Sequence, residues 1–221
     1  MSAPLKLINL GLPKSGTTTL AEALTKAGMR VADWKVRVGK AKVPCFVGQL
    51  MYQSYFETGD PLELLDKFDA FTEIDIVMRG FNLWPQFDWG LLSAIRAHHP
   101  GARFLLTTRD PAKQSDSMHR WTNLGTHRLP TNAIPGLPEG YGGTHAQRIR
   151  WIEGHVAFCR KIFGADKDFL ELSIEDPDAK AKLEDFSGIS LPWWGIANAN
   201  TRRLAEEEQH ELDELERLEH I

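Results

Sequence analysis

The sequence predicts an α/β domain in which a mostly parallel sheet is covered by helices on both faces. Two observations predict this fold: strand-like apolar runs alternate with amphipathic helical segments, and two of those runs end in loops that carry charged side chains. In such sheets the ligands bind at the carboxyl ends of the strands. The length of 221 residues fits one such domain, so we expect a single unit over residues 1–221.

The first strand and the first helix carry the clearest pattern. Residues 5–10 form an apolar run that leads into a loop, and apolar residues then recur at helical spacing until Gly28. The residues at helical spacing are Leu20, Ala23, Leu24 and Ala27. We therefore expect a strand, a loop and a helix in direct succession.

The later elements follow from the same periodicities and from capping residues. Asp60-Pro61 and Asp176-Pro177 each precede a helical pattern, and Pro100-Gly101 ends another. Further strands are expected at 70–76, 103–108 and 169–172. Further helices are expected at 62–68, 89–98, 112–121, 149–163 and 179–186.

Two segments depart from the regular alternation. Residues 125–143 are interrupted by prolines and glycines, and so long an irregular segment in a small domain is typical of a lid or a disordered loop. We expect it to be mobile. Residues 201–221 are acidic and helical in propensity, so we expect a C-terminal helix with a solvated charged face.

Composition and charge exclude several classes of protein. The chain is 42% hydrophobic and 25% charged with a net charge of −4, which is typical of a soluble globular protein and disfavours nucleic acid as the main partner. No apolar run approaches the roughly 20 residues that span a bilayer, so we expect no membrane span. Without a secretory signal, and with Cys45 and Cys159 expected as reduced thiols, the predicted location is cytoplasmic, and no metal site is expected.

The loop after the first strand has the composition of a phosphate site. Its residues are Pro13, Lys14, Ser15, Gly16, Thr17 and Thr18. The N–H groups of such a loop and of the following helix point at one spot, where the helix dipole also favours an anion. In the P-loop of nucleotide triphosphatases a lysine directly follows the second glycine, whereas here Thr17 has that position and Lys14 precedes Gly16. The loop therefore predicts a different phosphate ligand.

A second anion site is expected where the strand 103–108 ends. Arg109 follows this strand, and Ser117 lies two turns into the next helix, so both can face one ligand. A guanidinium group matches phosphate oxygens, and a serine hydroxyl adds a donor at another angle. Taken alone, a structural pair of Arg109 with Asp110 would explain the motif equally well.

Together the two motifs resemble those of the sulfotransferases that use 3′-phosphoadenosine 5′-phosphosulfate (PAPS), and the chain is most similar to short, soluble bacterial-type members. In that family a P-K-S-G-T-T loop binds the 5′-phosphosulfate, and residues 13–18 have the same sequence. A later R-[ND]-P motif with a serine eight residues after the arginine binds the 3′-phosphate, as Arg109 and Ser117 are placed to do. The resemblance implies a P-loop-containing, three-layer sulfotransferase fold. It also implies in-line transfer of a sulfuryl group to a hydroxyl or amine of a small-molecule or glycan acceptor.

The catalytic residues implied are a lysine and a general base. Lys14 would stabilise charge on the leaving oxygen. Family members carry the base, a histidine or a carboxylate, near the strand between the two motifs; here Glu73 is preferred and Asp75 is second, both expected on the same side of the strand 70–76. The alternative is that Glu73 and Asp75 are ordinary carboxylates at the end of a strand, which pair with Arg79 or contact solvent. Three histidines are further candidates: His119, His127 and His145.

Two family features are missing, and two other functions stay open. Thr19 replaces the aromatic residue that stacks on adenine in many members, and a late R-K-G motif is missing, with Arg202-Arg203 as a candidate in its place. Adenine could instead stack on one of four tryptophans, namely Trp34, Trp121, Trp193 and Trp194. The alternatives are a P-loop-like nucleotide kinase or hydrolase, and a non-catalytic nucleotide-binding protein.

Overall fold

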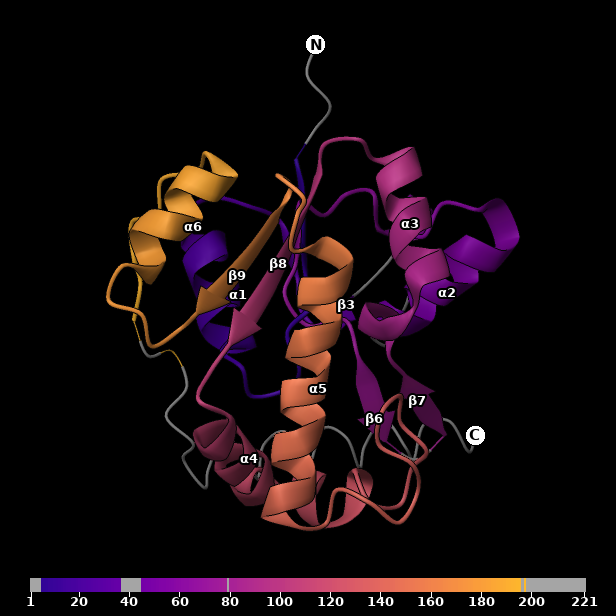
Figure 1. Cartoon of the computed structure of the whole chain (residues 1–221). Helices are drawn as coiled ribbons and strands as arrows, with labels where there is room; N and C mark the ends of the chain where they lie inside the picture. The colour runs from indigo at the N-terminus through magenta and orange to yellow at the C-terminus, as the bar shows by residue number, and fades with distance from the viewer. Residues whose placement is uncertain (1–4, 37–44, 79, 196, 198–221) are drawn as a thin grey trace.

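Parallel strands form the centre of the protein, as the sequence predicts. The computed structural model describes residues 5–36, 45–78, 80–195 and 197. Its main sheet has five parallel strands in the order β2-β5-β1-β8-β9 (Figure 1). In that order the strands are Val31–Ala32, Ala70–Phe71, Lys6–Asn9, Ala102–Thr108 and Phe169–Ser173.

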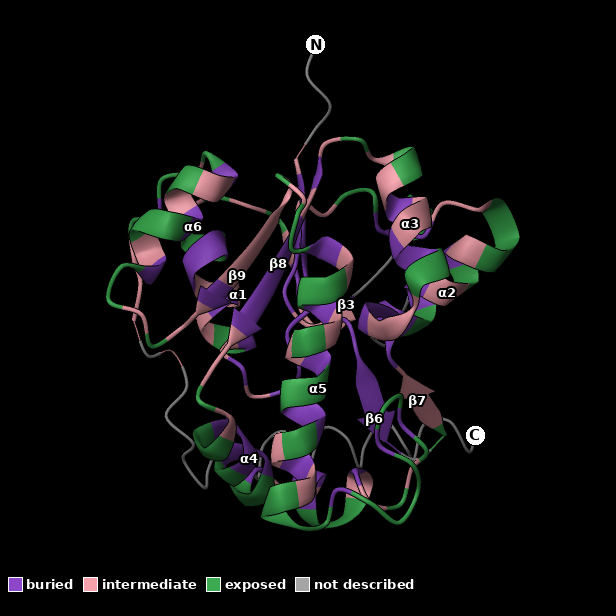
Figure 2. Cartoon of the chain, in the orientation of Figure 1, coloured by how far each residue is buried: buried purple, intermediate pink, exposed green. Residues whose placement is uncertain are grey.

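Helices cover both faces of this sheet because successive side chains of a strand point to opposite sides. Ile8 packs on one face, beneath α2 (Val47–Thr58), α3 (Trp89–His98) and α5 (His145–Phe163). Leu7 packs on the other face, beneath α1 (Thr17–Lys26) and α6 (Ala179–Ser187). Figure 2 shows β8 buried and the outer sides of the helices exposed, and every residue of β1 is buried as well. The predicted three-layer α/β fold is confirmed.

The remaining elements lie beyond the carboxyl edge of the sheet or beside it. Helix α4 (Pro111–Arg120) packs against α5. Two antiparallel pairs are separate from the main sheet: β3 (Lys35–Val36) with β4 (Cys45–Phe46), and β6 (Ile76–Met78) with β7 (Phe81–Leu83). Short helical turns occur at Glu63–Leu65, Pro85–Phe87 and Leu124–Arg128.

The expected strand 70–76 is wrong in its extent. Strand β5 ends at Phe71, and Ile76 begins a different strand that pairs with β7. The side chain of Asn9, at the end of β1, donates a hydrogen bond to the Thr72 carbonyl at 2.8 Å. A side-chain amide thus replaces the next backbone bond of the ladder, and residues 72–75 leave the sheet.

Two helical expectations also change. Residues 62–68 form only the 3₁₀ turn Glu63–Leu65, because the Asp60 carboxylate accepts from the Leu62 N–H and Phe68 N bonds back to Leu65 O, three residues earlier. Helix α2, which the sequence pattern does not predict, ends at Gly59 in the left-handed conformation. The expected acidic helix 201–221 lies outside the described residues.

The segment 125–143 is irregular, as expected, but much of it is packed. Leu129, Ile134 and Leu137 are buried in a cluster with Trp151, whose indole N–H donates to the Pro135 carbonyl at 2.9 Å. Its mobility stays a prediction.

A buried arginine holds the two ends of this segment. Arg148 is 2% exposed, and its Nη1 lies within 3.2 Å of the carbonyl oxygens of Gly125, Gly142 and Gly143. Its Nε donates to Ser115 Oγ at 2.9 Å, which ties the segment to α4. Burial lowers the pKa of Arg148, so the carbonyl groups must compensate the lost hydration of the guanidinium.

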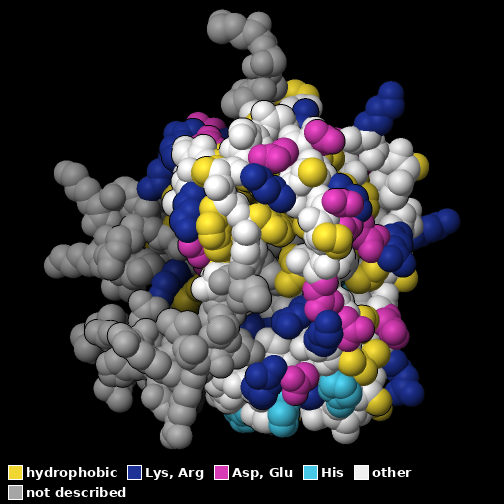
Figure 3. Space-filling view, turned by 90° about the vertical axis from the view of Figure 1, so that its left-hand side faces the viewer, with side chains coloured by type: hydrophobic (Ala, Val, Ile, Leu, Met, Phe, Trp, Pro, Cys, Tyr) yellow, Lys and Arg dark blue, Asp and Glu magenta, His cyan; other side chains and the backbone are white. Residues whose placement is uncertain are grey.

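The described helices and one face of the surface bear on the expectations for membrane spans and charge. None of the helices in the described part of the chain is long and apolar enough to cross a membrane. On the face drawn in Figure 3, acidic and basic side chains are interspersed over the described residues, in line with the net charge of −4.

We predict that Arg148→Met lowers the free energy of unfolding by about 3 kcal/mol, because it leaves several buried carbonyl groups without a donor. Arg150→Met is the matched control: Arg150 is exposed on the same helix, and its loss should cost less than about 0.5 kcal/mol. Urea unfolding of the wild type and the two variants measures both changes in the free energy of unfolding. Equal stabilities of the two variants would contradict the role given to Arg148.

Candidate active site

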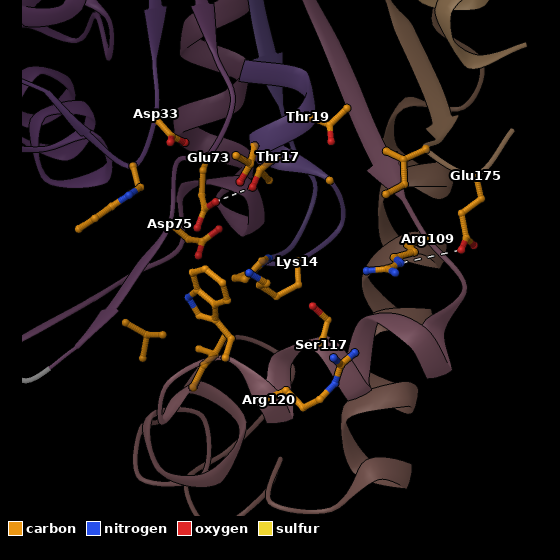
Figure 4. A pocket seen from close by; sticks show the side chains of 18 of the residues that line it. Lys14, Thr17, Thr19, Asp33, Glu73, Asp75, Arg109, Ser117, Arg120 and Glu175 are labelled. Carbon is orange, nitrogen blue, oxygen red and sulfur yellow. Dashed lines mark hydrogen bonds and ion pairs between the residues drawn. The ribbon is translucent and has the colours of Figure 1, made fainter. Parts of the chain in front are cut away.

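A cavity of about 980 Å³ lies beyond the carboxyl ends of the strands, where the sequence analysis places the ligand. Nine of the ten residues named there as site residues line it, and Figure 4 shows several of them. The nine are Pro13, Lys14, Gly16, Thr17, Thr18, Glu73, Asp75, Arg109 and Ser117. Residues far apart in the sequence are thus brought to one hollow.

The loop 13–18 turns sharply into α1. Lys14 has a φ of 66° and Gly16 a φ of 107°, both in the left-handed region that favours glycine. A Cβ on Gly16 would lie 2.5 Å from Ile174 Cγ2, so no larger residue fits there without displacement. Because Gly16 caps α1 without a side-chain bond and the first turn holds no acidic residue, the N–H groups and the dipole of this helix end remain suited to an anion.

Ser15 is the expected site residue that the structure does not bring to the cavity. It is 1% exposed, its Oγ lies 2.7 Å from Thr107 Oγ1, and its N–H donates to the Leu12 carbonyl. Thr107 is in turn 3.1 Å from Asn9 Nδ2. Ser15 therefore anchors the loop to β1 and β8, and its side chain does not point to a ligand.

The ammonium group of Lys14 lies over the indole ring of Trp121, 3.2 Å from the ring centroid. This cation–π contact keeps the charge of Lys14 inside the cavity, which both residues line. Trp121 is one of the four tryptophans expected from the sequence as candidates for adenine stacking. Of the other three tryptophans named for that role, Trp34 and Trp194 line the cavity and Trp193 does not.

The two expected carboxylates both line the cavity, although from the link between β5 and β6 and not from a strand. Thr17 Oγ1 donates to Glu73 Oε2 at 2.6 Å (Figure 4). Asp75 is 3% exposed, and Gln86 Nε2 donates to its Oδ1 at 2.7 Å. Burial, opposed in part by this hydrogen bond, raises the pKa of Asp75 to about 7. The two neighbouring carboxylates therefore have different environments.

The three candidate histidines do not line this cavity. His145 instead makes a 2.9 Å contact through Nδ1 with Ser115 Oγ. A general base in the cavity would accordingly be a carboxylate.

Arg109 and Ser117 line the side of the cavity that lies opposite Glu73 (Figure 4). Asp110 caps α4 by accepting from the Lys113 N–H at 2.9 Å, which fixes how the strand passes into the helix. Arg109 Nε lies 3.9 Å from Glu175 Oε1, and among the described residues it is a buried donor without a hydrogen-bond partner. Such a donor is suited to an anionic ligand.

The cavity is also lined by charged residues that were not among the site residues expected from the sequence. They are Asp33, Arg120, Arg128, Glu175 and Asp176. Arg128 comes from the segment 125–143, and Arg120 lies one turn after Asp116, with which it pairs at 2.7 Å. Arg120 could have been found from its helical spacing, three residues after Ser117, whereas nothing local in the sequence marks Arg128. No cluster of three or more metal-ligating side chains occurs in the described ranges.

The chain is similar to known proteins in both sequence and fold. The family model described as "Sulfotransferase domain" matches residues 6–167, which is well over half of the chain. The crystal structure of a sulfotransferase from Alicyclobacillus acidocaldarius has a similar fold, with a TM-score of 0.50 and 15% sequence identity over 96% of each chain. At that identity the second match is evidence for the fold alone. No curated protein matches the chain.

We predict that the contribution of Asp75 to stability falls as the pH rises from about 4 to about 7, whereas buried His155, whose pKa is lowered to about 4, contributes stability that rises with pH over part of the same range. The folded state keeps the Asp75 carboxyl protonated up to about pH 7, whereas the unfolded chain releases the proton near pH 3.8, so the folded state binds more protons in this window. The free energy of unfolding should fall by on the order of 1 kcal/mol per pH unit through this group. Asp75→Asn should remove that part of the slope in urea unfolding between about pH 4 and about pH 8. An unchanged slope in the variant would show that Asp75 is not the group concerned.

Proposed function

Because the chain belongs to the sulfotransferase-domain family, we propose that it transfers a sulfuryl group from PAPS to a hydroxyl or amine of a small-molecule or glycan acceptor. The observation that carries the proposal is that one cavity combines two cationic anion sites with a carboxylate. Lys14 and the N-terminus of α1 form one site, and Arg109 with Ser117 forms the other. A donor with a phosphate at each end of its nucleoside matches this pair of sites.

Two details of the cavity fit this donor. Gly16 allows the loop backbone to approach a phosphate closely, since a side chain there would meet Ile174. Arg109 lines the cavity, where its guanidinium group would donate to a 3′-phosphate in competition with Glu175, whose Oε1 lies 3.9 Å from Arg109 Nε. Thr17 and Thr18 would add hydroxyl donors to the 5′-phosphate, with the loop held in place by Ser15.

Lys14 and Glu73 would carry the chemistry. PAPS supplies a sulfuryl group on a good leaving group, and attack on the sulfur places negative charge on the bridging oxygen. Lys14, at the wall that Trp121 forms, is positioned to stabilise that charge. Glu73 would accept the proton of the acceptor, with the more deeply buried Asp75 as the second candidate.

The same geometry disfavours a P-loop kinase or hydrolase. In those enzymes a lysine after the second glycine reaches the β- and γ-phosphates, and a threonine or serine holds Mg²⁺. Here Thr17 takes the lysine position, and its hydroxyl bonds to Glu73. A non-catalytic nucleotide-binding protein could use Lys14 to bind phosphate but would not need the carboxylate of Glu73 at the cavity, yet Glu73 lines it.

Adenosine 3′,5′-bisphosphate, the product left by the donor, should stabilise the protein against heat. A ligand at 100 times its dissociation constant adds about 2.7 kcal/mol to the free energy of unfolding. Thermal unfolding with the bisphosphate, compared with ATP plus Mg²⁺ at equal concentration, measures the preference. Stronger stabilisation by ATP would contradict the proposed donor.

Substitutions should separate chemistry from binding. Lys14→Ala should abolish turnover, and Glu73→Gln should lower kcat by about 10²- to 10⁴-fold, while both variants still bind the bisphosphate. Arg109→Ala should weaken bisphosphate binding by roughly 10- to 100-fold, because a charge-assisted hydrogen bond is lost.

Transfer of labelled sulfate from PAPS to a cell extract gives the rates of these variants, and calorimetry gives their affinities for the bisphosphate. Lys161→Ala, on the exposed side of α5, is the control that should change neither. Full turnover of Glu73→Gln would exclude Glu73 as the base.

A further inference from the structure

Thr17 joins the expected phosphate site directly to the expected base. It is the first residue of α1, it is 4% exposed, and its Oγ1 lies 2.6 Å from Glu73 Oε2. An ionised carboxylate has no proton to give, so the hydroxyl is the donor in this bond. Figure 4 shows that the bond lies at the wall of the cavity, on the side of Lys14.

The hydroxyl group has only one proton to donate. A phosphate held by the loop and by the first turn of α1 would lie next to Thr17 and would also accept from it. Glu73 and the phosphate therefore compete for one donor. The competition ends only when the hydroxyl turns to the phosphate or when Glu73 itself becomes protonated.

We infer that Thr17 couples binding of the donor to the strength of Glu73 as a proton acceptor; this rests on the proposed function. Without the donor, the hydroxyl stabilises the ionised carboxylate. With the donor bound, Glu73 loses that hydrogen bond and lies near an additional negative charge, and both changes favour its protonated form. Thr17 is thus a positioning residue that makes Glu73 a stronger base when the donor is in place.

The proton count is consistent with this role. The proton of the acceptor moves to Glu73, and Thr17 keeps its own proton throughout. Once Glu73 is protonated, its O–H can donate to Thr17 Oγ1, while Thr17 donates to the phosphate. Binding of phosphate and protonation of Glu73 are therefore linked, and the linkage is reciprocal: each must strengthen the other.

The test measures proton uptake when adenosine 3′,5′-bisphosphate binds. Titration calorimetry in buffers of different ionisation enthalpy gives the number of protons taken up, and the difference between wild type and Glu73→Gln isolates the share of Glu73. Thr17→Val removes the hydroxyl at nearly constant volume, and Thr17→Ser keeps it. We expect Thr17→Val to lose more than half of that proton uptake, with a smaller change in affinity, because the hydroxyl exchanges a bond to Glu73 for one to the phosphate. Thr17→Ser should resemble the wild type in both, and Glu73→Gln should bind about threefold more tightly or better.

Each result supports or overturns the inference. Weaker binding by Thr17→Val with undiminished proton uptake would mean that Thr17 only supports the loop, and it would overturn the coupling. If Thr17→Val does not fold, Thr17→Ala replaces it, since it also lacks the hydroxyl. If the wild type does not bind the bisphosphate, both the proposed function and this inference are contradicted. If the wild type binds it but Thr17→Val keeps the full proton uptake, only the inference is contradicted.

Discussion

The site depends on the hydrogen bonds of one buried side chain, that of Asn9. Its amide nitrogen donates to the Thr72 carbonyl, and its oxygen accepts from the N–H groups of Gly11 and Thr107. The Thr72 carbonyl and these two N–H groups lie at or just after the carboxyl ends of β5, β1 and β8. Without the amide of Asn9, each of them would be buried without this hydrogen-bond partner. Asn9 therefore fixes the carboxyl edge of the sheet, and it makes the chain leave the sheet after Phe71.

Two consequences of this constraint reach the cavity. The chain that leaves β5 carries Glu73 and Asp75 to the cavity wall. On the other side, Thr107 contacts both Asn9 and Ser15, so the same network holds the loop from which Lys14 projects. The cation and the carboxylates are thus placed by one set of buried polar contacts, which is rigid because each member is satisfied.

The two carboxylates illustrate how burial divides roles between similar groups. Asp75 is deeply buried, and its pKa is raised to about 7. Glu73 receives a hydrogen bond from Thr17 at the N-terminus of α1, where the dipole also favours negative charge. When neighbouring carboxylates have different environments, one site contains groups with different proton affinities.

The sequence predicts what local periodicity and capping control. The helix after the loop, the helix 89–98 and the strand that precedes Arg109 lie where their patterns predict them. Non-local contacts control the rest. The break between Phe71 and Ile76 depends on a side chain more than 60 positions earlier, the bond from Ser15 to Thr107 spans 92 positions, and the contact of Lys14 with Trp121 joins a loop to the end of α4. Periodicity within a segment carries no information on such pairs, so it predicts neither the bond of Ser15 to Thr107 nor the contact of Trp121 with Lys14.

The most direct test of the account is a crystal structure of the protein with adenosine 3′,5′-bisphosphate. We expect the 5′-phosphate on the loop 13–18 and the first turn of α1, with Lys14 and Thr17 turned toward it, and the 3′-phosphate on Arg109 and Ser117. A bisphosphate bound with its two phosphates exchanged, or bound outside this cavity, would contradict the account.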